Sequence, residues 1–420
     1  MVLLKQLTRS ISIFFAGLIT FCCVASTTLD GRAPLVPAPL QQHVVLISLD
    51  GFRWDYIEKF AAKNLAAIAD KGVRAKRMQP VYPTKTFPNH LSMVTGLLPV
   101  NHGIIDNEFC DSARQLQCYQ MGMGKTDSSW VSGIPLWNLV KMNGLKSATY
   151  FWPESEARIN GMVPDYYYYY SQHADYSQRV EQIMQWLRLP NGLRPTFVAG
   201  YFSLVDTIGH RYGPDSEQTK QAVLELDALI GLLYADLQTL PFAVNLVIVS
   251  DHGMAQIDPK KAISYPSLPI SNRWLVKNSE SRLLLYAKSD AKVDKAKQIE
   301  LLKAAAKGRF KVLSDEQLAA LHYQNSSRIP DIILETQPPR VFKGNEKLTD
   351  LGIHGYVDAD TMDAIFIAAG PAFKTGLVLP VVENLDVYPT LAQVMGLTLF
   401  NQPDGDGATL APALLPAKRK

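Results

Sequence analysis

Six acidic and histidine residues are of the types that bind metal ions, and they occur in four short strings. The strings are Ser-Leu-Asp-Gly, Asp-Thr-Ile-Gly-His, Ser-Asp-His-Gly and Gly-Ile-His-Gly, and their candidate ligands are Asp50, Asp206, His210, Asp251, His252 and His354. Carboxylate and imidazole are the ligands that zinc prefers when thiolates are absent. Three aspartates and three histidines match two ions with three protein ligands each. Taken singly, an Asp-Gly or His-Gly pair is more typical of a turn or a helix cap.

A threonine in the string Tyr-Pro-Thr-Lys-Thr-Phe-Pro-Asn-His, residues 82–90, is a candidate nucleophile. Pro88 suits the first turn of a helix, so Thr86 is expected at or just before the N-cap. Backbone N–H groups at the start of a helix attract phosphoryl oxygens, and a bound metal ion can activate a hydroxyl placed there. Without the candidate metal ligands, Thr86 would be interpreted only as a capping residue.

The elements that must position these residues alternate between short apolar runs and longer amphipathic stretches. The expected strands are 44–49, 196–203, 244–249 and 364–369, and the helices between them include 58–71 and 217–237. Fully apolar strands separated by helices indicate an α/β fold, with a mostly parallel sheet covered on both faces. Ligands bind beyond the carboxyl ends of such strands. The residues at or just past these ends are Asp50, Asp206, Asp251 and His252.

The composition is that of an ordinary globular protein. The chain has 420 residues, of which 47% are hydrophobic and 19% charged, and its formal net charge is +3. This length fits one large α/β domain with insertions or two modest domains. Lysine and arginine form no long block apart from the C-terminal Lys-Arg-Lys. A groove for polymeric nucleic acid is therefore not indicated.

Residues 1–26 have the pattern of a secretory signal peptide. Lys5 and Arg9 precede an apolar run of about 15 residues, which ends in small residues. The run is shorter than the roughly 20 residues that span a bilayer, so no stable membrane span is expected after cleavage, although an uncleaved anchor is the alternative. Residues 27–42 then form a proline-containing linker before a single domain at 43–420. The chain is expected to be exported, to the periplasm or outside the cell.

Two cysteines remain after the signal segment. Cys110 and Cys118 lie eight residues apart. In an oxidising compartment such a pair is expected to close a small disulfide loop.

As a set, the motifs of this chain resemble the nucleotide pyrophosphatase/phosphodiesterase family of the alkaline phosphatase superfamily. The resemblance extends over about residues 43–400, and the motifs occur in the order of the family. They are Leu49-Asp50-Gly51-Phe52-Arg53, the string from Pro83 to His90, Gly96-Leu97-Leu98-Pro99, the string from His102 to Asn107, Phe151-Trp152-Pro153 with Ser155-Glu156, the string from Asp206 to His210 with Gly213-Pro214, the string from Ser250 to Met254, and His354-Gly355.

The resemblance implies a role for each candidate ligand. Thr86 would be the nucleophile, and two zinc ions would bind to each chain. Asp50, Asp251 and His252 would hold one ion together with the Thr86 hydroxyl. The other ion would be held by Asp206, His210 and His354. By the same resemblance, the histidines at 90 and 102 are structural.

The resemblance also implies how a nucleotide would bind. Asn107 and the backbone N–H of Thr86 would hold a non-bridging phosphate oxygen. Phe87 and Tyr201 would sandwich the nucleobase, since aromatic faces stack well on flat rings. Tyr170 is a further candidate, but the run of five tyrosines at 166–170 leaves open which of them occupies this position. Ordinary core packing is the alternative for Phe87 and Tyr201.

The implied fold is alkaline-phosphatase-like, with helices on both faces of the sheet and inserted loops that form a small cap. The implied activity is hydrolysis of nucleotide phosphodiester or phosphoanhydride bonds to nucleoside 5′-monophosphates through a covalent threonine intermediate. A phosphomonoesterase is one rival, but the neutral Asn107 suits the single charge of a diester. A phospholipid or choline-headgroup phosphodiesterase is another. It would use the same metal site with a different pocket, and the sequence does not exclude it. Ser203-Leu204-Val205 stands where acidic residues and a proline are common in the family, and this difference leaves the substrate preference open.

Overall fold

The structure is a computed structural model that describes residues 42–288, 292–357 and 359–416. The expected signal peptide, and the expected linker apart from its last residue, lie outside these ranges. Within them, no helix is both long enough and apolar enough to cross a membrane.

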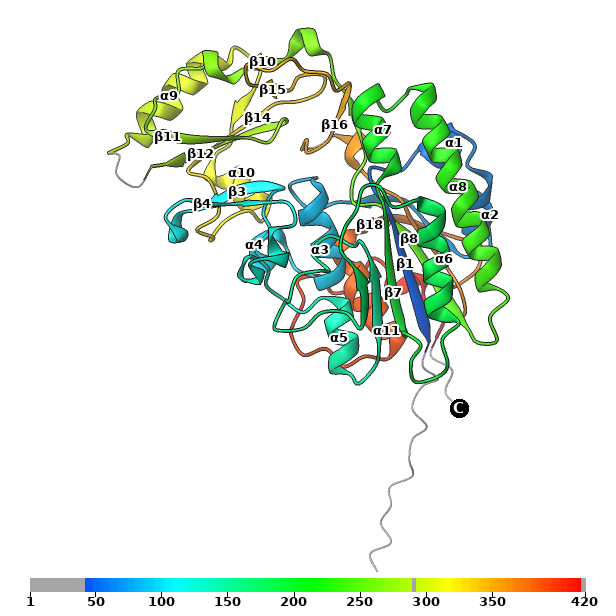
Figure 1. The fold of residues 1–420 in the computed structure, drawn as a ribbon. Helices are drawn as coiled ribbons and strands as arrows, with labels where there is room; N and C mark the ends of the chain where they lie inside the picture. Colours follow the sequence, from blue (N-terminus) through cyan, green and yellow to red (C-terminus); the bar gives the residue numbers. More distant parts are fainter. Residues whose placement is uncertain (1–41, 289–291, 358, 417–420) are drawn as a thin grey trace, which may run out of the picture. The chain divides into compact units, whose positions relative to one another are not determined.

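An eight-stranded sheet forms the centre of the fold (Figure 1), with the order β18-β2-β17-β8-β1-β7-β5-β6. Strand β17 pairs antiparallel with both of its neighbours, and the other neighbouring strands pair parallel. The strands are β1 (His43–Leu49), β2 (Val73–Gln79), β5 (Ser147–Tyr150), β6 (Tyr166–Tyr168), β7 (Phe197–Phe202), β8 (Val244–Val249), β17 (Phe366–Ala369) and β18 (Leu377–Glu383). The expected mostly parallel α/β sheet is therefore confirmed.

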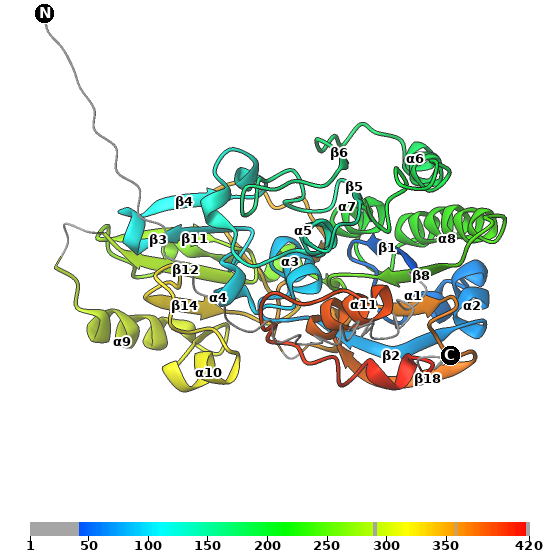
Figure 2. The same cartoon turned by 90° about the horizontal axis from the view of Figure 1, so that it is seen from below.

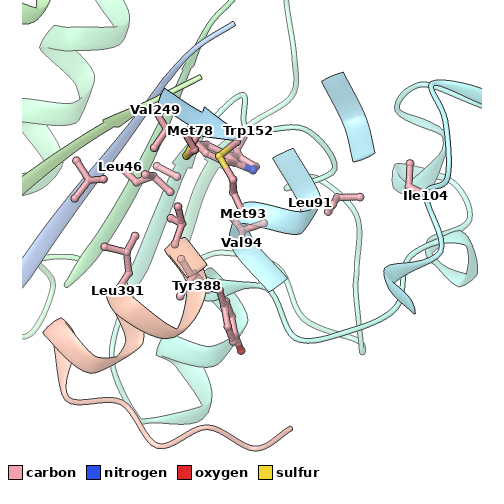
Figure 3. Packing of buried hydrophobic residues seen from close by; sticks show 14 of the residues in the cluster. Leu46, Met78, Leu91, Met93, Val94, Ile104, Trp152, Val249, Tyr388 and Leu391 are labelled. Atoms are coloured by element: carbon pink, nitrogen blue, oxygen red, sulfur yellow. The ribbon is translucent and has the colours of Figure 1, made fainter. Parts of the chain in front are cut away.

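Alternate residues of the central strands enter two separate apolar clusters, because successive side chains of a strand point to opposite faces of the sheet. Val44 and Leu46 of β1 belong to one cluster, and Val45 and Ile47 belong to the other. Figure 3 shows the first cluster, in which Leu46 lies near side chains from the helices of this face. Burial on both faces explains why these strands are continuous apolar runs in the sequence.

Helices cover both faces of the sheet. The residues of α2 (Lys63–Asp70), α6 (Tyr176–Leu187), α7 (Leu204–Tyr212) and α8 (Glu217–Leu237) pack into one cluster. The other cluster contains residues of α3 (Thr86–Thr95), α5 (Leu136–Met142) and α11 (Val387–Met395). The helix expected at 217–237 is confirmed as α8. The helix expected at 58–71 is instead two helices, α1 (Tyr56–Lys59) and α2, because Ala61 between them has a positive φ of 54°.

The expected cap of inserted loops is a regular structure instead. It is a four-stranded antiparallel sheet with the order β11-β12-β14-β13. Figure 2 shows α9 and α10 beside these strands. The elements are β11 (Trp274–Asn278), β12 (Arg282–Ala287), α9 (Lys295–Ala306), β13 (Lys311–Val312), α10 (Asp315–Ala320) and β14 (Ile332–Glu335). This insertion has its own apolar cluster, which includes Leu283, Leu285 and Leu334.

Short elements complete the described part of the chain. Strands β3 (Glu108–Asp111) and β4 (Gln117–Gln120) form a hairpin in which Cys110 lies opposite Cys118. These two cysteines form a disulfide, as the sequence predicts. The remaining α-helix and β-strands are α4 (Pro99–His102), β9 (Ala255–Gln256), β10 (Ile263–Ser264), β15 (Phe342–Lys343) and β16 (Gly352–Ile353), and the other short elements are 3-10 helices.

Candidate active site

The six predicted metal ligands follow the ends of four strands. Asp50 follows β1, and Asp251 with His252 follows β8. Asp206 and His210 lie on α7, which begins two residues after the end of β7, and His354 follows β16. Because Asp206 and His210 are four residues apart on one helix, their side chains share a face. The fold therefore brings distant parts of the sequence to one place.

A glycine allows two of these strand ends to approach each other closely. Gly51 has a φ of 68°, and a Cβ atom at this position would lie 2.9 Å from Cα of Asp206. Its N–H group donates a hydrogen bond of 3.2 Å to the Asp251 carboxylate. The backbone thus requires a glycine at position 51, and the close approach brings Asp50, Asp206 and Asp251 near one another.

One group of candidate ligands surrounds the imidazole of His252. Its Nε2 atom lies 3.0 Å from Oδ2 of Asp251 and 3.6 Å from Oδ1 of Asp50. The Oγ1 atom of Thr86 lies 3.3 Å from the same nitrogen. Asp50, Asp251 and His252 each offer a ligand atom, and these atoms lie within 4.8 Å of one another. This group contains the three protein ligands predicted for the first metal ion.

A second group lies around the carboxylate of Asp206. Its Oδ1 atom is 3.3 Å from Nε2 of His210 and 3.9 Å from Nε2 of His354. The rings of His252 and His354 stack with their centroids 3.6 Å apart. The ligand atoms of Asp206, His354 and His252 all lie within 4.8 Å of one another. His252 therefore contributes to both groups.

The hydrogen bonds of the three histidines fix their tautomers. In each ring Nδ1 lies 2.9 Å from a backbone carbonyl oxygen, and these oxygens belong to Gly352 for His210, Gly253 for His252 and Thr84 for His354. A carbonyl oxygen only accepts hydrogen bonds, so Nδ1 must carry the proton. In the neutral ring Nε2 then presents a lone pair, which is the usual arrangement of a metal-binding histidine.

These lone pairs face carboxylate oxygens, and this arrangement fits metal ions. Among the candidate metal ligands, three buried carboxylate oxygens have no hydrogen-bond partner, namely Oδ1 of Asp50, Oδ1 of Asp206 and Oδ2 of Asp251. Burial and the charges of Asp251 and Asp206 raise the pKa of Asp50 well above its usual range. Facing lone pairs and crowded carboxylates repel one another unless cations lie between them. The donor set therefore fits two divalent cations.

The candidate nucleophile begins a helix. Helix α3 starts at Thr86, and its N-cap is Lys85. The expectation that Thr86 lies at or before the N-cap is wrong by one position, because Lys85 is still extended. Asn107 lies against the same turn, where its Oδ1 accepts a hydrogen bond of 3.0 Å from the N–H of Phe87. His90 supports the turn from behind, with Nδ1 2.8 Å from the carbonyl oxygen of Thr86.

A cavity of about 560 Å³ opens in front of Thr86. It is lined by all four residues that the sequence assigns to substrate, namely Phe87, Asn107, Tyr170 and Tyr201. Tyr201 is only 8% exposed, and its hydroxyl donates a hydrogen bond to Asp50. The ring of Tyr170 is 50% exposed and lies 5.3 Å from the ring of Phe151. Of the two tyrosines, Tyr170 therefore offers the larger free face.

Six charged residues that the sequence did not predict as site residues also line this cavity. They are Lys85, Lys125, Glu154, Glu156, Glu280 and Asp350. Lys85 lies inside a recognised motif, and its place next to Thr86 was a signal that could have identified it. Glu280 and Asp350 lie in segments without any motif, so only the fold brings them to the cavity.

Comparison with known proteins places this chain in a family. The family model described as type I phosphodiesterase/nucleotide pyrophosphatase matches residues 44–357. The human ectonucleotide pyrophosphatase/phosphodiesterase family member 1 is 34% identical over 368 residues, which are 84% of this chain and 40% of that protein. A venom phosphodiesterase of Macrovipera lebetinus is 35% identical over 379 residues, covering 85% of this chain and 43% of that protein. The chain thus spans about two fifths of the length of these relatives.

Solved structures agree with this assignment. An inactive form of murine ectonucleotide pyrophosphatase/phosphodiesterase 5 in complex with AMP superposes with a TM-score of 0.82 at 26% identity, over 89% of this chain and 100% of that chain. The human form of the same protein gives a TM-score of 0.80 at 28% identity, with the same coverage. The chain belongs to the type I phosphodiesterase/nucleotide pyrophosphatase family, a family of hydrolases.

Proposed function

We propose that this chain is a phosphodiesterase that uses two zinc ions and Thr86. Its substrates are nucleotides with phosphodiester or phosphoanhydride bonds, and its product is a nucleoside 5′-monophosphate. The observation that carries the proposal is the position of Thr86 Oγ1, 3.3 Å from His252 Nε2, at the opening of a cavity next to two groups of metal-binding side chains. Zinc suits this set of imidazole and carboxylate ligands.

The residues of the chain would carry out two displacements. Two cations held by the candidate ligands would supply positive charge to the attacking and leaving oxygens. In the first displacement, the proton of Thr86 Oγ1 passes to solvent, Oγ1 forms a bond to phosphorus, and the bond to the leaving oxygen breaks, so that the leaving group departs with the electron pair. In the second, the oxygen of a water molecule attacks phosphorus and the bond to Oγ1 breaks. The monophosphate leaves, and the Thr86 hydroxyl regains a proton.

Asn107 would orient the phosphate in both displacements. Its Oδ1 is occupied by the N–H of Phe87, so its Nδ2 group is the one that can donate to a non-bridging oxygen. The N–H of Thr86 is in the first turn of α3, where backbone donors lack partners within the helix. A neutral amide suits the single charge of a diester better than the double charge of a monoester. This observation favours a diesterase over the phosphomonoesterase rival.

The aromatic wall of the cavity supports a nucleotide as substrate. Phe87 is half-buried, Tyr170 is half-exposed, and both line the cavity, as do Phe151 and Trp152. We place the nucleobase between Phe87 and Tyr170, while Tyr201 orients Asp50 through its hydroxyl. The structure of the murine relative is a complex with AMP, a nucleoside 5′-monophosphate like the product proposed here.

Export of the protein agrees with the disulfide between Cys110 and Cys118, since disulfides persist in oxidising compartments. We therefore propose a periplasmic or secreted enzyme, with residues 43–420 as its catalytic domain.

The test compares hydrolysis of p-nitrophenyl thymidine monophosphate, a diester, with hydrolysis of p-nitrophenyl phosphate, a monoester. Wild-type protein and Thr86→Ala would be assayed after their zinc content is measured. We expect faster diester turnover, about two zinc ions per chain, and loss of turnover in Thr86→Ala although its metal content is retained. Faster monoester turnover would support the phosphatase instead. Hydrolysis of choline-headgroup lipids with no nucleotide turnover would support the lipid phosphodiesterase.

A further inference from the structure

The cavity in front of Thr86 has two chemically different sides. One side includes the rings of Phe151 and Tyr170, where the Glu156 carboxylate accepts a hydrogen bond from the N–H of Tyr170. The other side includes the charged residues Lys85, Glu280 and Asp350. Phe87, Lys125 and Glu154 also line the cavity. A phosphodiester has two arms, and the aromatic side suits the nucleoside arm. The charged side is then left for the second arm, which becomes the leaving group.

Lys85, which directly precedes Thr86, forms an ion pair with a carboxylate. Nζ of Lys85 lies 3.0 Å from Oε2 of Glu280, and the lysine side chain is only 3% exposed. The stem of Lys85 passes Gly355, where a Cβ atom would lie 2.6 Å from Cε of the lysine. The missing side chain of Gly355 therefore leaves the space through which Lys85 reaches Glu280.

The turn between β11 and β12 presents Glu280 in an uncommon backbone conformation. Glu280 has a φ of 61°, in a region that favours glycine or asparagine. Hydrogen bonds hold the turn. The N–H of Glu280 donates to Asn278 Oδ1 at 3.0 Å, and the carbonyl oxygen of Glu280 accepts from the N–H of Phe342 at 2.7 Å. The N–H of Ser279 donates to the carbonyl oxygen of Arg282 at 2.9 Å. The Glu280 side chain is 37% exposed, and Glu280 is among the residues that line the cavity.

A second carboxylate makes this side of the cavity acidic. Asp350 lines the same cavity and lies close enough to Glu280 for their charges to interact. Around the whole cavity, apart from the metal ligands, two basic residues (Lys85 and Lys125) face four acidic ones (Glu154, Glu156, Glu280 and Asp350). Near the leaving-group arm, Lys85 is set against Glu280 and Asp350, so the formal charge there is also negative.

We propose that Glu280 is a specificity-determining residue, which selects substrates whose leaving group carries little negative charge. By binding Lys85, it withdraws the lysine from a polyphosphate, and together with Asp350 it repels one. Diesters of neutral or singly charged alcohols are then better substrates than nucleoside triphosphates, whose leaving group is pyrophosphate. This inference rests on the proposed function, because both kinds of substrate must be cleaved at Thr86.

The test uses two substrates that share one nucleoside. They are p-nitrophenyl thymidine monophosphate and thymidine triphosphate, and kcat/KM is measured for both with zinc-loaded protein. The difference in intrinsic reactivity between the two substrates cancels when the ratio of their kcat/KM values in a variant is compared with the same ratio in wild type. In Glu280→Gln we expect the ratio of kcat/KM for the triphosphate to that for the p-nitrophenyl ester to rise roughly tenfold, since one negative charge is removed and Lys85 is released. Asp350→Asn should raise the same ratio by a smaller factor.

Two further variants separate specificity from general damage. Lys85→Met introduced into Glu280→Gln should abolish the gain, because the released lysine is what attracts the polyphosphate. Glu300→Gln changes an exposed glutamate on α9 of the same insertion and should leave the ratio unchanged. Equilibrium binding to Thr86→Ala protein provides a readout without turnover: Glu280→Gln should tighten binding of thymidine triphosphate more than binding of thymidine monophosphate.

The outcomes distinguish this inference from the proposed function. If Glu280→Gln lowers both activities equally, or leaves the ratio within about twofold of wild type, the pair is only structural and the specificity inference is wrong. If wild-type protein shows no hydrolysis of the p-nitrophenyl ester that depends on Thr86, the proposed function fails and this inference fails with it.

Discussion

Arg282 and Asp106 form an ion pair inside the protein, and both side chains are fully buried. Arg282 lies on β12 of the inserted sheet, whereas Asp106 directly precedes Asn107. The Asp106 carboxylate also accepts hydrogen bonds from the N–H of Asn107 at 2.7 Å and from the Ser279 hydroxyl at 3.0 Å. The ion pair therefore connects the insertion to the loop that carries the proposed phosphate-binding amide.

Breaking this pair should destabilise the protein strongly. In Arg282→Met the Asp106 charge stays buried without its partner, and we expect a loss of about 3–5 kcal/mol in the free energy of unfolding, measured in urea. Adding Asp106→Asn should restore part of the loss. Lys277→Met is a matched control, because Lys277 pairs with Glu108 at 3.6 Å near the surface and should cost at most about 1 kcal/mol. If Arg282→Met lowers the free energy of unfolding as little as Lys277→Met does, the stabilising role of the Arg282–Asp106 ion pair is contradicted.

The aromatic wall should determine affinity for the base. Removal of a ring that stacks on a base costs roughly 1–3 kcal/mol, so Phe87→Ala and Tyr170→Ala should each raise KM for p-nitrophenyl thymidine monophosphate about tenfold. Hydrolysis of bis(p-nitrophenyl) phosphate, which has no base, should change much less. Tyr169→Ala provides the control, because Tyr169 is 65% exposed and is not among the residues that line the cavity. An equal effect of all three substitutions would argue against stacking.

Removal of metal should affect stability as well as activity. Without cations, the buried carboxylates of Asp50, Asp206 and Asp251 face one another and imidazole lone pairs. Treatment with a chelator should therefore abolish turnover and lower Tm by an amount on the order of 5 °C or more. Thr86→Ala should show the same drop in Tm, because it keeps the six protein ligands. An unchanged Tm and full activity after verified loss of metal would refute the metal site.

His102 should make stability depend on pH. Its ring is fully buried, and burial lowers its pKa to about 3 from an ordinary value of 6.5. Above pH 6.5 the ring is neutral in both the folded and the unfolded chain. As the pH falls below 6.5, only the unfolded chain gains the proton, so this residue removes up to about 1.4 kcal/mol of stability per pH unit until the pH nears 3.

Urea unfolding near pH 7 and near pH 5 checks this expectation. His102→Gln should lose less stability than wild type between these two conditions, because glutamine does not titrate. The exposed His173 provides the comparison, and His173→Gln should follow the wild-type dependence. A wild-type pH dependence that survives His102→Gln unchanged would assign the effect to another group.

The central sheet could be predicted from the sequence because its strands are buried on both faces. Such strands are continuous apolar runs, and the runs at 44–49 and 244–249 match β1 and β8 closely. The antiparallel direction of β17 could not be predicted, since an apolar run does not show the direction of its strand. The inserted sheet was expected as loops, because its strands are short and its core forms from segments as distant as Leu283 and Leu334.

The candidate metal ligands could be predicted because each lies in a distinctive short string. The charged side of the cavity could not. Glu280 is presented by a turn of the insertion and Asp350 by a loop before β16, and neither has a recognisable pattern. Likewise, the different exposure of Tyr170 and Tyr201 depends on a hydrogen bond from Tyr201 to Asp50, more than 150 residues apart in sequence. Such contacts follow only from the folded structure.

The stereochemistry at phosphorus tests the central claim most directly. A thymidine 5′-phosphorothioate ester that is chiral at phosphorus would be hydrolysed in isotopically labelled water, and the configuration of the product would be determined. Each in-line displacement inverts the configuration, so the two displacements through Thr86 predict net retention. Net inversion would mean that water attacks the substrate directly, and it would contradict the role of Thr86 as nucleophile.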